Sequence, residues 1–235
     1  FDRGRIFVCD AESDDDLKRI IAAARQDGRR TLYVGTAGMA DNLMELEKPT
    51  LPSFGVVASI SSVANEQMRY CERAGYAMVK VPVARIMTGT VRPEDYRDMA
   101  VEYLKSGRDT ILLTDTAYDR ELIELSQEVG EKSGMDLTEV GDYVRSLIGR
   151  MAKEVLDSAA VSGVYLTGGD TALGMLMNIG ADGSEILAEI LVGVPLVRVK
   201  GGAYEGLKLV TKAGAFGTED AAAFAMRKIK ERGRI

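Results

Sequence analysis

Short apolar runs alternate with amphipathic stretches along most of the chain. The runs predict strands over residues 6–9, 31–34, 54–60, 76–83, 110–113 and 164–166. Between them, apolar residues recur at helical spacing, and the clearest stripe extends from Val140 to Leu156 within one long predicted helix. Strands and helices in alternation favour an α/β fold, with a largely parallel sheet flanked by helices.

The last part of the chain departs from this alternation. Three β-type runs follow one another at residues 186–190, 196–199 and 207–211, with three glycines between the last two. This pattern is typical of a hairpin, so we expect an antiparallel addition to the sheet near residues 186–211. A final helix is predicted from Thr218 to about Arg232.

Two prolines, Pro49 and Pro52, interrupt the pattern and predict a linker over residues 48–53. A length of 235 residues accommodates one large domain or two small ones. The chain begins with Phe1 rather than Met, and an apolar run follows almost at once. We therefore expect a part of a longer polypeptide, or a chain whose first residues are missing.

Composition narrows the chemistry. The sequence has no histidine, which excludes Ser-His-Asp and Cys-His catalysis and histidine-ligated zinc. A net charge of −6 argues against a nucleic-acid binder but allows one small anionic ligand. Cys9 and Cys71 are far apart and predict reduced, buried thiols of a cytoplasmic protein rather than a disulfide. No apolar run has the ~18 residues of a membrane span.

The common phosphate-binding patterns are absent, because the sequence contains neither a Gly-Lys dipeptide nor two glycines one residue apart. The strongest remaining candidate is the strand-to-helix turn at residues 166–172, LTGGDTA. N–H groups at a helix start suit a phosphate, and Gly168 and Gly169 let a ligand approach the backbone. A tight turn capped by Asp170 or Thr171 explains the same residues equally well.

The second candidate is the turn at residues 211–220, TKAGAFGTED. Lys212 supplies a cation, and Gly214 and Gly217 let backbone amides turn toward an anion. Acidic residues follow, which suit magnesium. A helix capped by Thr218, with acids that complement its dipole, is the alternative and is favoured for Glu219.

The third candidate is the turn at residues 58–62, where the hydroxyls of Ser59 and Ser61 either bind phosphate or cap the following helix. Capping is the favoured interpretation. The turn at residues 35–38 has the same design and the same ambiguity.

Together, and in this order, these turns resemble the four-carbon acid sugar kinase family. Residues 34–40 resemble its VGSAGLA, residues 58–67 its GSxSPxTxxQ, and residues 192–195 its PGVP. Residues 166–172 read LTGGDTA as in the family, and residues 211–217, TKAGAFG, resemble TKSGGFG. This chain departs from the family pattern at Ala58, Ser62, Ala64 and Val192.

The resemblance implies an ATP-dependent kinase that phosphorylates an acid sugar such as threonate or erythronate and uses Mg²⁺. It implies that residues 1–48 are the end of an acid-sugar-binding domain and that residues 54–235 form a nucleotide-binding domain. The implied nucleotide contacts are Ser59, Ser61, Gly168, Gly169, Asp170, Thr171, Lys212, Gly214 and Gly217, with Asp170 and Asp220 for the metal.

The family's DDxTGA-like signature, which supplies its catalytic acid or base, is absent from this chain. The catalytic group is therefore unassigned, and we expect the chain alone to be inactive. Two alternatives stay open: a module that binds nucleotide without phosphoryl transfer, and a sugar-phosphate enzyme of another class. The acid sugar and ATP are the expected partners, without nucleic acid or membrane, and a homodimer is compatible with the sequence.

Overall fold

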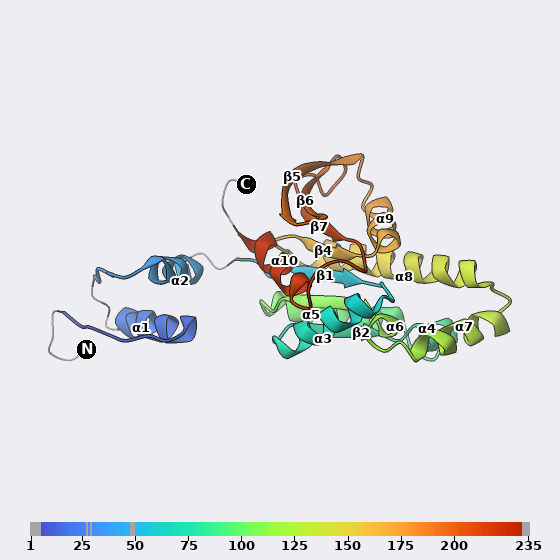
Figure 1. Ribbon diagram of the computed structural model, residues 1–235, viewed down its shortest axis with the longest axis horizontal. Coiled ribbons are helices and arrows are strands. Elements are labelled where there is room, and N and C mark those ends of the chain that lie inside the picture. The colour runs from blue at the N-terminus through green and yellow to red at the C-terminus, as the bar shows by residue number, and fades with distance from the viewer. Residues whose placement is uncertain (1–5, 27, 29, 48–49, 232–235) are drawn as a thin grey trace. The chain divides into compact units, whose positions relative to one another are not determined.

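The computed structural model describes residues 6–26, 28, 30–47 and 50–231, and the chain divides into two compact units, Phe1–Thr50 and Leu51–Ile235 (Figure 1). We call them the N-terminal unit and the C-terminal unit. The ends predicted for the first and last helices, at Asp27 and Arg232, lie outside the described residues, as do Lys48 and Pro49 of the predicted linker.

The N-terminal unit consists of two helices, α1 (Asp14–Gln26) and α2 (Ala37–Glu47). Asn42 on α2 links the two helices, because its Nδ2 donates to Asp14 Oδ1 at 3.0 Å. The same nitrogen donates to Gly38 O within α2 at 2.8 Å. Of the turn at residues 35–38, the last two residues belong to α2, which begins at Ala37.

The two strands predicted for the N-terminal unit are wrong. Residues 6–9 and 31–34 have no regular secondary structure. Their apolar side chains are exposed, as Val8 (94%) and Leu32 (88%) illustrate. A strand is stable only when a neighbouring backbone satisfies its N–H and C=O groups. No strand is present among the described residues of this unit.

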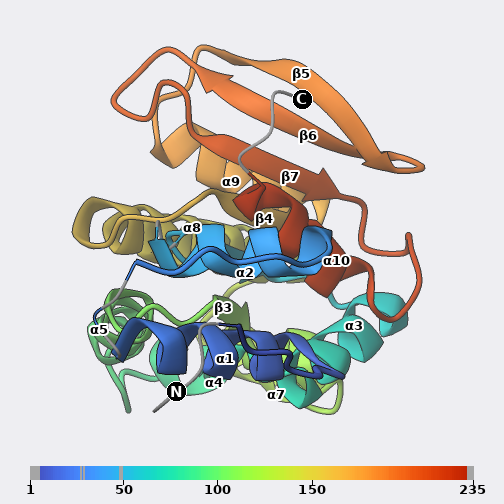
Figure 2. The same cartoon turned by 90° about the vertical axis from the view of Figure 1, so that its left-hand side faces the viewer.

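The C-terminal unit is built on one seven-stranded sheet with the order β2-β3-β1-β4-β7-β6-β5. The first five strands in this order are parallel, and β6 and β5 add antiparallel to β7. Figure 2 shows β5, β6 and β7 at one side of the sheet. The strands are β1 (Phe54–Val57), β2 (Ala77–Val81), β3 (Thr110–Thr114), β4 (Val164–Thr167), β5 (Gly183–Leu191), β6 (Val194–Lys200) and β7 (Lys208–Lys212). The predicted α/β class and the antiparallel addition are confirmed.

Helices cover both faces of this sheet. On one face α5, α8 and α9 pack against residues such as Val56 and Leu166, and on the other α3 and α10 pack against residues such as Val57 and Tyr165. Buried residues on both faces explain why β1 and β3 read as unbroken apolar runs rather than as alternating patterns. The helices are α3 (Ser62–Arg73), α4 (Val83–Met87), α5 (Pro93–Lys105), α6 (Asp115–Tyr118), α7 (Leu122–Lys132), α8 (Leu137–Ser158), α9 (Gly169–Asn178) and α10 (Ala221–Lys230).

The register of the central strands sets the position of the site. Val57 at the end of β1 pairs with Thr167 at the end of β4, which pairs with Lys212 at the end of β7. The three segments that follow these strands therefore leave the sheet at the same edge, side by side. In open α/β sheets, ligands bind in the crevice outside the carboxyl ends of the strands.

Candidate functional site

The three candidate turns of the C-terminal unit come together at this edge. Ser61 Oγ, after β1, donates to Gly214 O, after β7, at 2.7 Å. Gly168 N, after β4, donates to Lys212 O at 3.0 Å. A Cβ built on Gly168 would lie 3.5 Å from Ser59 Cβ. Ser61 and Gly214, which lie 153 positions apart in the sequence, thus belong to one cluster.

Two glycines at this edge have distinct structural reasons. Gly168 has a φ of +98°, a region that L side chains rarely adopt. A Cβ on Gly214 would lie 2.2 Å from Ser59 Oγ, so a side chain there requires the Ser59 hydroxyl to move. Gly169 differs, because a Cβ there would meet no atom within 4 Å. The space beside Gly169 is therefore open to a ligand.

The first turn of α9 has no side-chain cap. The helix begins at Gly169 rather than at Asp170 or Thr171, and its N-cap residue is Gly168. The predicted capping by Asp170 or Thr171 is therefore wrong, because both residues lie inside the first turn. Asp170 is exposed and Thr171 is 3% exposed. The N–H groups at the start of a helix lack intrahelical partners and favour an anion.

The two serines after β1 differ in what their hydroxyls do. Ser61 is the N-cap of α3, since its Oγ accepts from Ala64 N at 3.1 Å, which confirms the predicted capping. Its single hydroxyl proton is donated to Gly214 O. Ser59 makes a longer contact, 3.5 Å, from its Oγ to Ser61 Oγ. Of the two, Ser59 has the hydroxyl that a ligand can engage.

Lys212 lies beneath the loop that follows β7 and is 2% exposed. Its Nζ donates to three carbonyl oxygens, those of Ala213 (2.8 Å), Gly214 (3.2 Å) and Phe216 (2.9 Å). Burial lowers the pKa of Lys212 to about 8. All three ammonium protons are thus used to hold the loop, and the positive charge lies directly under it.

Gln67 was not among the predicted site residues, yet it contacts the same loop. It lies on α3, is fully buried, and its Nε2 donates to the carbonyl oxygens of Phe216 (3.0 Å), Gly217 (3.4 Å) and Thr218 (2.9 Å). The sequence carried one signal for it, the glutamine of the motif at residues 58–67, a polar residue on an otherwise apolar helix face.

The acidic residues after the loop lie in a different arrangement from the expected one. Helix α10 begins at Ala221, and Thr218 Oγ1 donates to Asp220 Oδ1 at 2.6 Å. Capping by Thr218 is therefore wrong, because the N-cap residue of α10 is Asp220. Glu219 lies 3.6 Å from Arg73 in an exposed ion pair.

The structure shows no group of three or more potential metal-ligating side chains in the parts of the chain that it describes. Mg²⁺ at a nucleotide commonly uses only one or two carboxylates together with phosphate oxygens and water. Asp170, exposed in the first turn of α9, fits such a role. Asp220 and Asp170 stay predictions as metal ligands.

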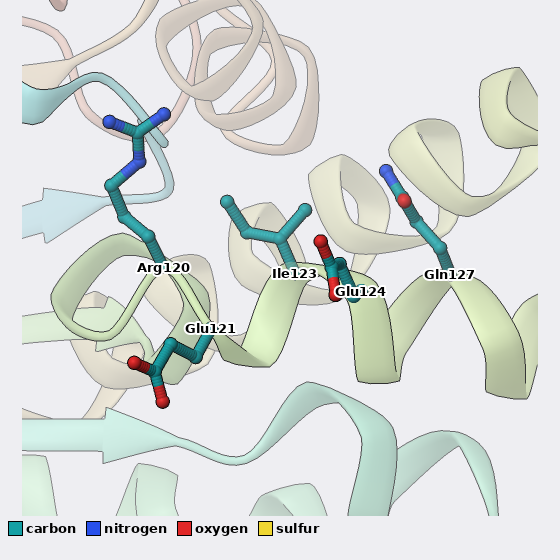
Figure 3. Close-up of a pocket in the computed structure, with 5 residues that line it drawn as sticks. All are labelled: Arg120, Glu121, Ile123, Glu124 and Gln127. Carbon is teal, nitrogen blue, oxygen red and sulfur yellow. The ribbon is translucent and has the colours of Figure 1, made fainter.

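An open hollow of about 780 Å³ lies elsewhere, around the start of α7 (Figure 3). The lining residues are Arg120, Glu121, Ile123, Glu124 and Gln127. They include none of the predicted site residues. Figure 3 shows Arg120 and Glu121 directed away from each other.

The two cysteines are both free thiols. Cys71 is buried between α3 and the sheet, and burial raises its pKa to about 12. Cys9 is exposed, so the prediction of a buried thiol is wrong for this residue, because the strand expected to bury it does not form. Among the helices of the described ranges, none has the length and apolar character needed to cross a membrane.

Two family models match the chain and divide it in the same way as the fold does. Residues 54–222 match a nucleotide-binding C-terminal domain, and residues 2–43 match a sugar-binding N-terminal domain.

Curated relatives extend over nearly the whole chain. A D-threonate kinase of Salmonella typhimurium is 31% identical over 96% of this chain and 55% of its own length. A D-erythronate kinase of Heliobacterium modesticaldum is 24% identical over 93% of this chain and 52% of its own length. The chain therefore spans about half the length of the curated relatives that it matches.

Solved structures share the fold. A Bordetella bronchiseptica protein, described as a domain of unknown function with bound citrate and as a domain-swapped dimer, matches with a TM-score of 0.65 and 27% identity. The match covers 94% of this chain and 52% of that one. A Haemophilus influenzae protein matches with a TM-score of 0.58 at 18% identity, which supports the fold alone.

Proposed function

The chain belongs to the four-carbon acid sugar kinase family, and on that premise we propose that it is the ATP-binding part of a kinase for a four-carbon acid sugar of the threonate or erythronate type. In this proposal residues 54–235 bind the nucleotide, and residues 1–48 are the end of the acid-sugar-binding domain. The names of the relatives support the acid sugar as substrate, and the matched nucleotide-binding domain supports ATP.

One observation carries the proposal: three loops meet at the carboxyl edge of the sheet around the uncapped start of α9. A helix start without a side-chain cap, next to glycines that expose the backbone, is suited to a phosphate group. The hydroxyl of Ser59 and the buried charge of Lys212 both lie beside the backbone of Gly214. These groups together favour a polyphosphate over a neutral ligand.

Phosphoryl transfer depends mainly on positioning and on neutralising charge, so it needs no histidine. We propose that the amides of Gly169 and Asp170 bind phosphate oxygens and that Ser59 donates one further hydrogen bond. Lys212 lowers the electrostatic cost of the phosphate charge from beneath the loop. When bound, Mg²⁺ would neutralise phosphate charge, with Asp170 and Asp220 as the proposed carboxylates.

We further propose that this chain alone binds nucleotide and transfers no phosphoryl group. The support is that it spans about half the length of its relatives and lacks the family's DDxTGA-like segment. For the whole protein we propose a cytoplasmic enzyme, consistent with its free thiols. A homodimer is also proposed, because the related Bordetella bronchiseptica protein is described as a dimer.

Calorimetric titration of the 235-residue chain with ATP and Mg²⁺ tests the nucleotide site. We expect a single site with a dissociation constant in the range of micromolar to millimolar, and no hydrolysis or transfer. Absence of binding at millimolar ATP by a folded chain would refute the proposal. The acid sugar is tested by assaying the complete gene product with threonate, erythronate and other four-carbon acids.

A further inference from the structure

Buried side chains hold the loop of residues 213–218, between β7 and α10, by its carbonyl groups. Lys212 and Gln67 are buried beneath this loop, Ser61 is half-buried beside it, and all three donate to it. Gln67 holds the second half of the loop, which Lys212 reaches only at Phe216. The carbonyl oxygens that accept are those of Ala213, Gly214, Phe216, Gly217 and Thr218.

The direction of these carbonyls fixes the direction of the amides. In a trans peptide unit, the C=O of one residue and the N–H of the next point in opposite directions. No cis peptide bond occurs in the described residues. Carbonyls of residues 213, 214, 216 and 217 that face the buried donors therefore turn the amides of residues 214, 215, 217 and 218 away from the protein interior.

These four amides have no hydrogen-bond acceptor within the part of the chain that the structure describes, whereas the amide of Phe216 donates to Ala213 O at 3.2 Å. Residues 215, 217 and 218 are exposed, and Gly214 is half-buried beside Ser59. Successive amides that point outward from a loop form a concave site for an anion. The buried carbonyl contacts are what give the loop this property.

We propose that Gln67 is a positioning residue of the phosphate site, which holds the loop carbonyls on the buried side so that the loop amides face the bound phosphate groups. This inference rests on the proposed function, since ATP is the source of the phosphate. Gln67 touches no ligand itself. It acts through the amides of residues 217 and 218, which follow two of the carbonyls it holds.

The remaining atom of the Gln67 amide group argues against a role in stability alone. Its Oε1 is buried and has no hydrogen-bond partner among the described residues. A buried acceptor without a partner is costly, and an apolar side chain of similar size avoids that cost. The amide is therefore explained by what its Nε2 does for the loop.

The test uses Gln67→Met, which keeps the volume of the side chain and removes its donors. Glycine-labelled protein is titrated with ATP and Mg²⁺, and separately with inorganic tripolyphosphate, while the amide resonances of Gly214 and Gly217 are followed. In the wild type both ligands shift these resonances. In Gln67→Met we expect both dissociation constants to rise about tenfold or more. Each factor of ten corresponds to about 1.4 kcal/mol of binding free energy. The thermal midpoint should remain near that of the wild type.

Asn65→Leu is the matched control. Asn65 lies on the same helix, and its Nδ2 donates to the carbonyls of Ala117 and Tyr118, away from the loop. This variant also loses amide-to-carbonyl hydrogen bonds, so it reports any general effect on α3. We expect its dissociation constants and glycine shifts to match those of the wild type.

Gln67→Glu keeps the test decisive if the methionine variant fails to fold. A carboxylate beneath the loop repels the carbonyls, whereas the protonated acid restores one donor. The Lys212 ammonium shares the Phe216 carbonyl with Gln67 and favours the ionised carboxylate. Binding by this variant should therefore be much weaker than that of the wild type at pH 8, and wild-type affinity there would overturn the inference.

The outcomes separate the two proposals. If Gln67→Met binds both ligands as tightly as the wild type does, the proposed role of Gln67 is overturned and the kinase proposal is unaffected. A wild-type chain that binds tripolyphosphate at Gly214 and Gly217 but not ATP refutes the nucleotide proposal and supports the loop. A wild-type chain that binds neither overturns both.

Discussion

The two backbone segments that meet at the candidate site present amides in different ways. The start of α9 exposes N–H groups because every helix does, and it needs only the absence of a cap at Gly168. The loop of residues 213–218 has no regular structure, so side chains from β7 and α3 hold its carbonyls. The helix start is therefore a local property of the sequence, whereas the loop depends on distant residues.

This difference predicts how substitutions in each segment affect stability and nucleotide binding. A change that displaces the loop from the loop after β1 should affect both the fold nearby and the binding of nucleotide. A change at the helix start that fits the open space should affect binding alone.

The largest effect is expected from Gly214→Val. A Cβ at this position would lie 2.2 Å from Ser59 Oγ and 3.4 Å from Ser59 Cβ, so the Ser59 hydroxyl must move and the valine methyl groups press on the loop after β1. Overpacking of this kind costs about 1–3 kcal/mol of unfolding free energy. Nucleotide binding should be lost as well. Urea denaturation and calorimetry measure the two effects, and a variant that retains both wild-type stability and wild-type affinity would contradict the close approach of the loops.

Lys212→Met should change the pH dependence of stability. Burial lowers the pKa of Lys212 to about 8, below the value of about 10.4 for an unfolded lysine. Between these values the unfolded chain binds more protons, so the unfolding free energy of the wild type rises with pH relative to the variant. Urea denaturation at pH 7 and at pH 9.5 measures this. Parallel changes in the two proteins would contradict the lowered pKa of Lys212.

Ser59→Ala and Ser61→Ala should have smaller effects, the first on ATP binding and the second on stability. Loss of the Ser61 cap costs about 0.5–2 kcal/mol of stability, because Ala64 N loses its acceptor. Ser59→Ala should leave stability within about 0.5 kcal/mol of the wild type and weaken ATP binding by a factor on the order of ten, as one hydrogen bond is worth. Thermal denaturation and calorimetry compare them, and the reverse pattern would exchange the roles of the two serines.

The fold of the C-terminal unit could be predicted because its apolar runs belong to strands that pair with one another. The apolar runs placed β1, β4 and β7 close to their observed positions. That the turns after these strands meet at one edge is a finding of the structure, because the run at residues 207–211 was predicted only as part of an antiparallel addition. In the N-terminal unit the same kind of run gave two strands that do not form. An apolar run predicts a strand only where a partner strand exists.

The sequence predicted which backbone turns form the candidate site, but not which side chains contact those turns. Gly168 and Gly169 were identified from a local pattern. The roles of Gln67 and Lys212 depend on which carbonyls turn inward, and Gln67 lies 149 residues from Phe216 in the sequence. Spacing along the chain contains no information about a contact of that range.

The most direct test of a phosphate site at the start of α9 is a titration of Gly169→Val with ATP and Mg²⁺, beside the wild type and the control Gly141→Val. Both glycines lie on helices, and at both a Cβ meets no atom within 4 Å, but Gly141 lies on α8 outside the converging loops. We expect all three proteins to fold with similar thermal midpoints, and Gly169→Val alone to lose nucleotide binding. Wild-type affinity in Gly169→Val would contradict a phosphate site at this helix start.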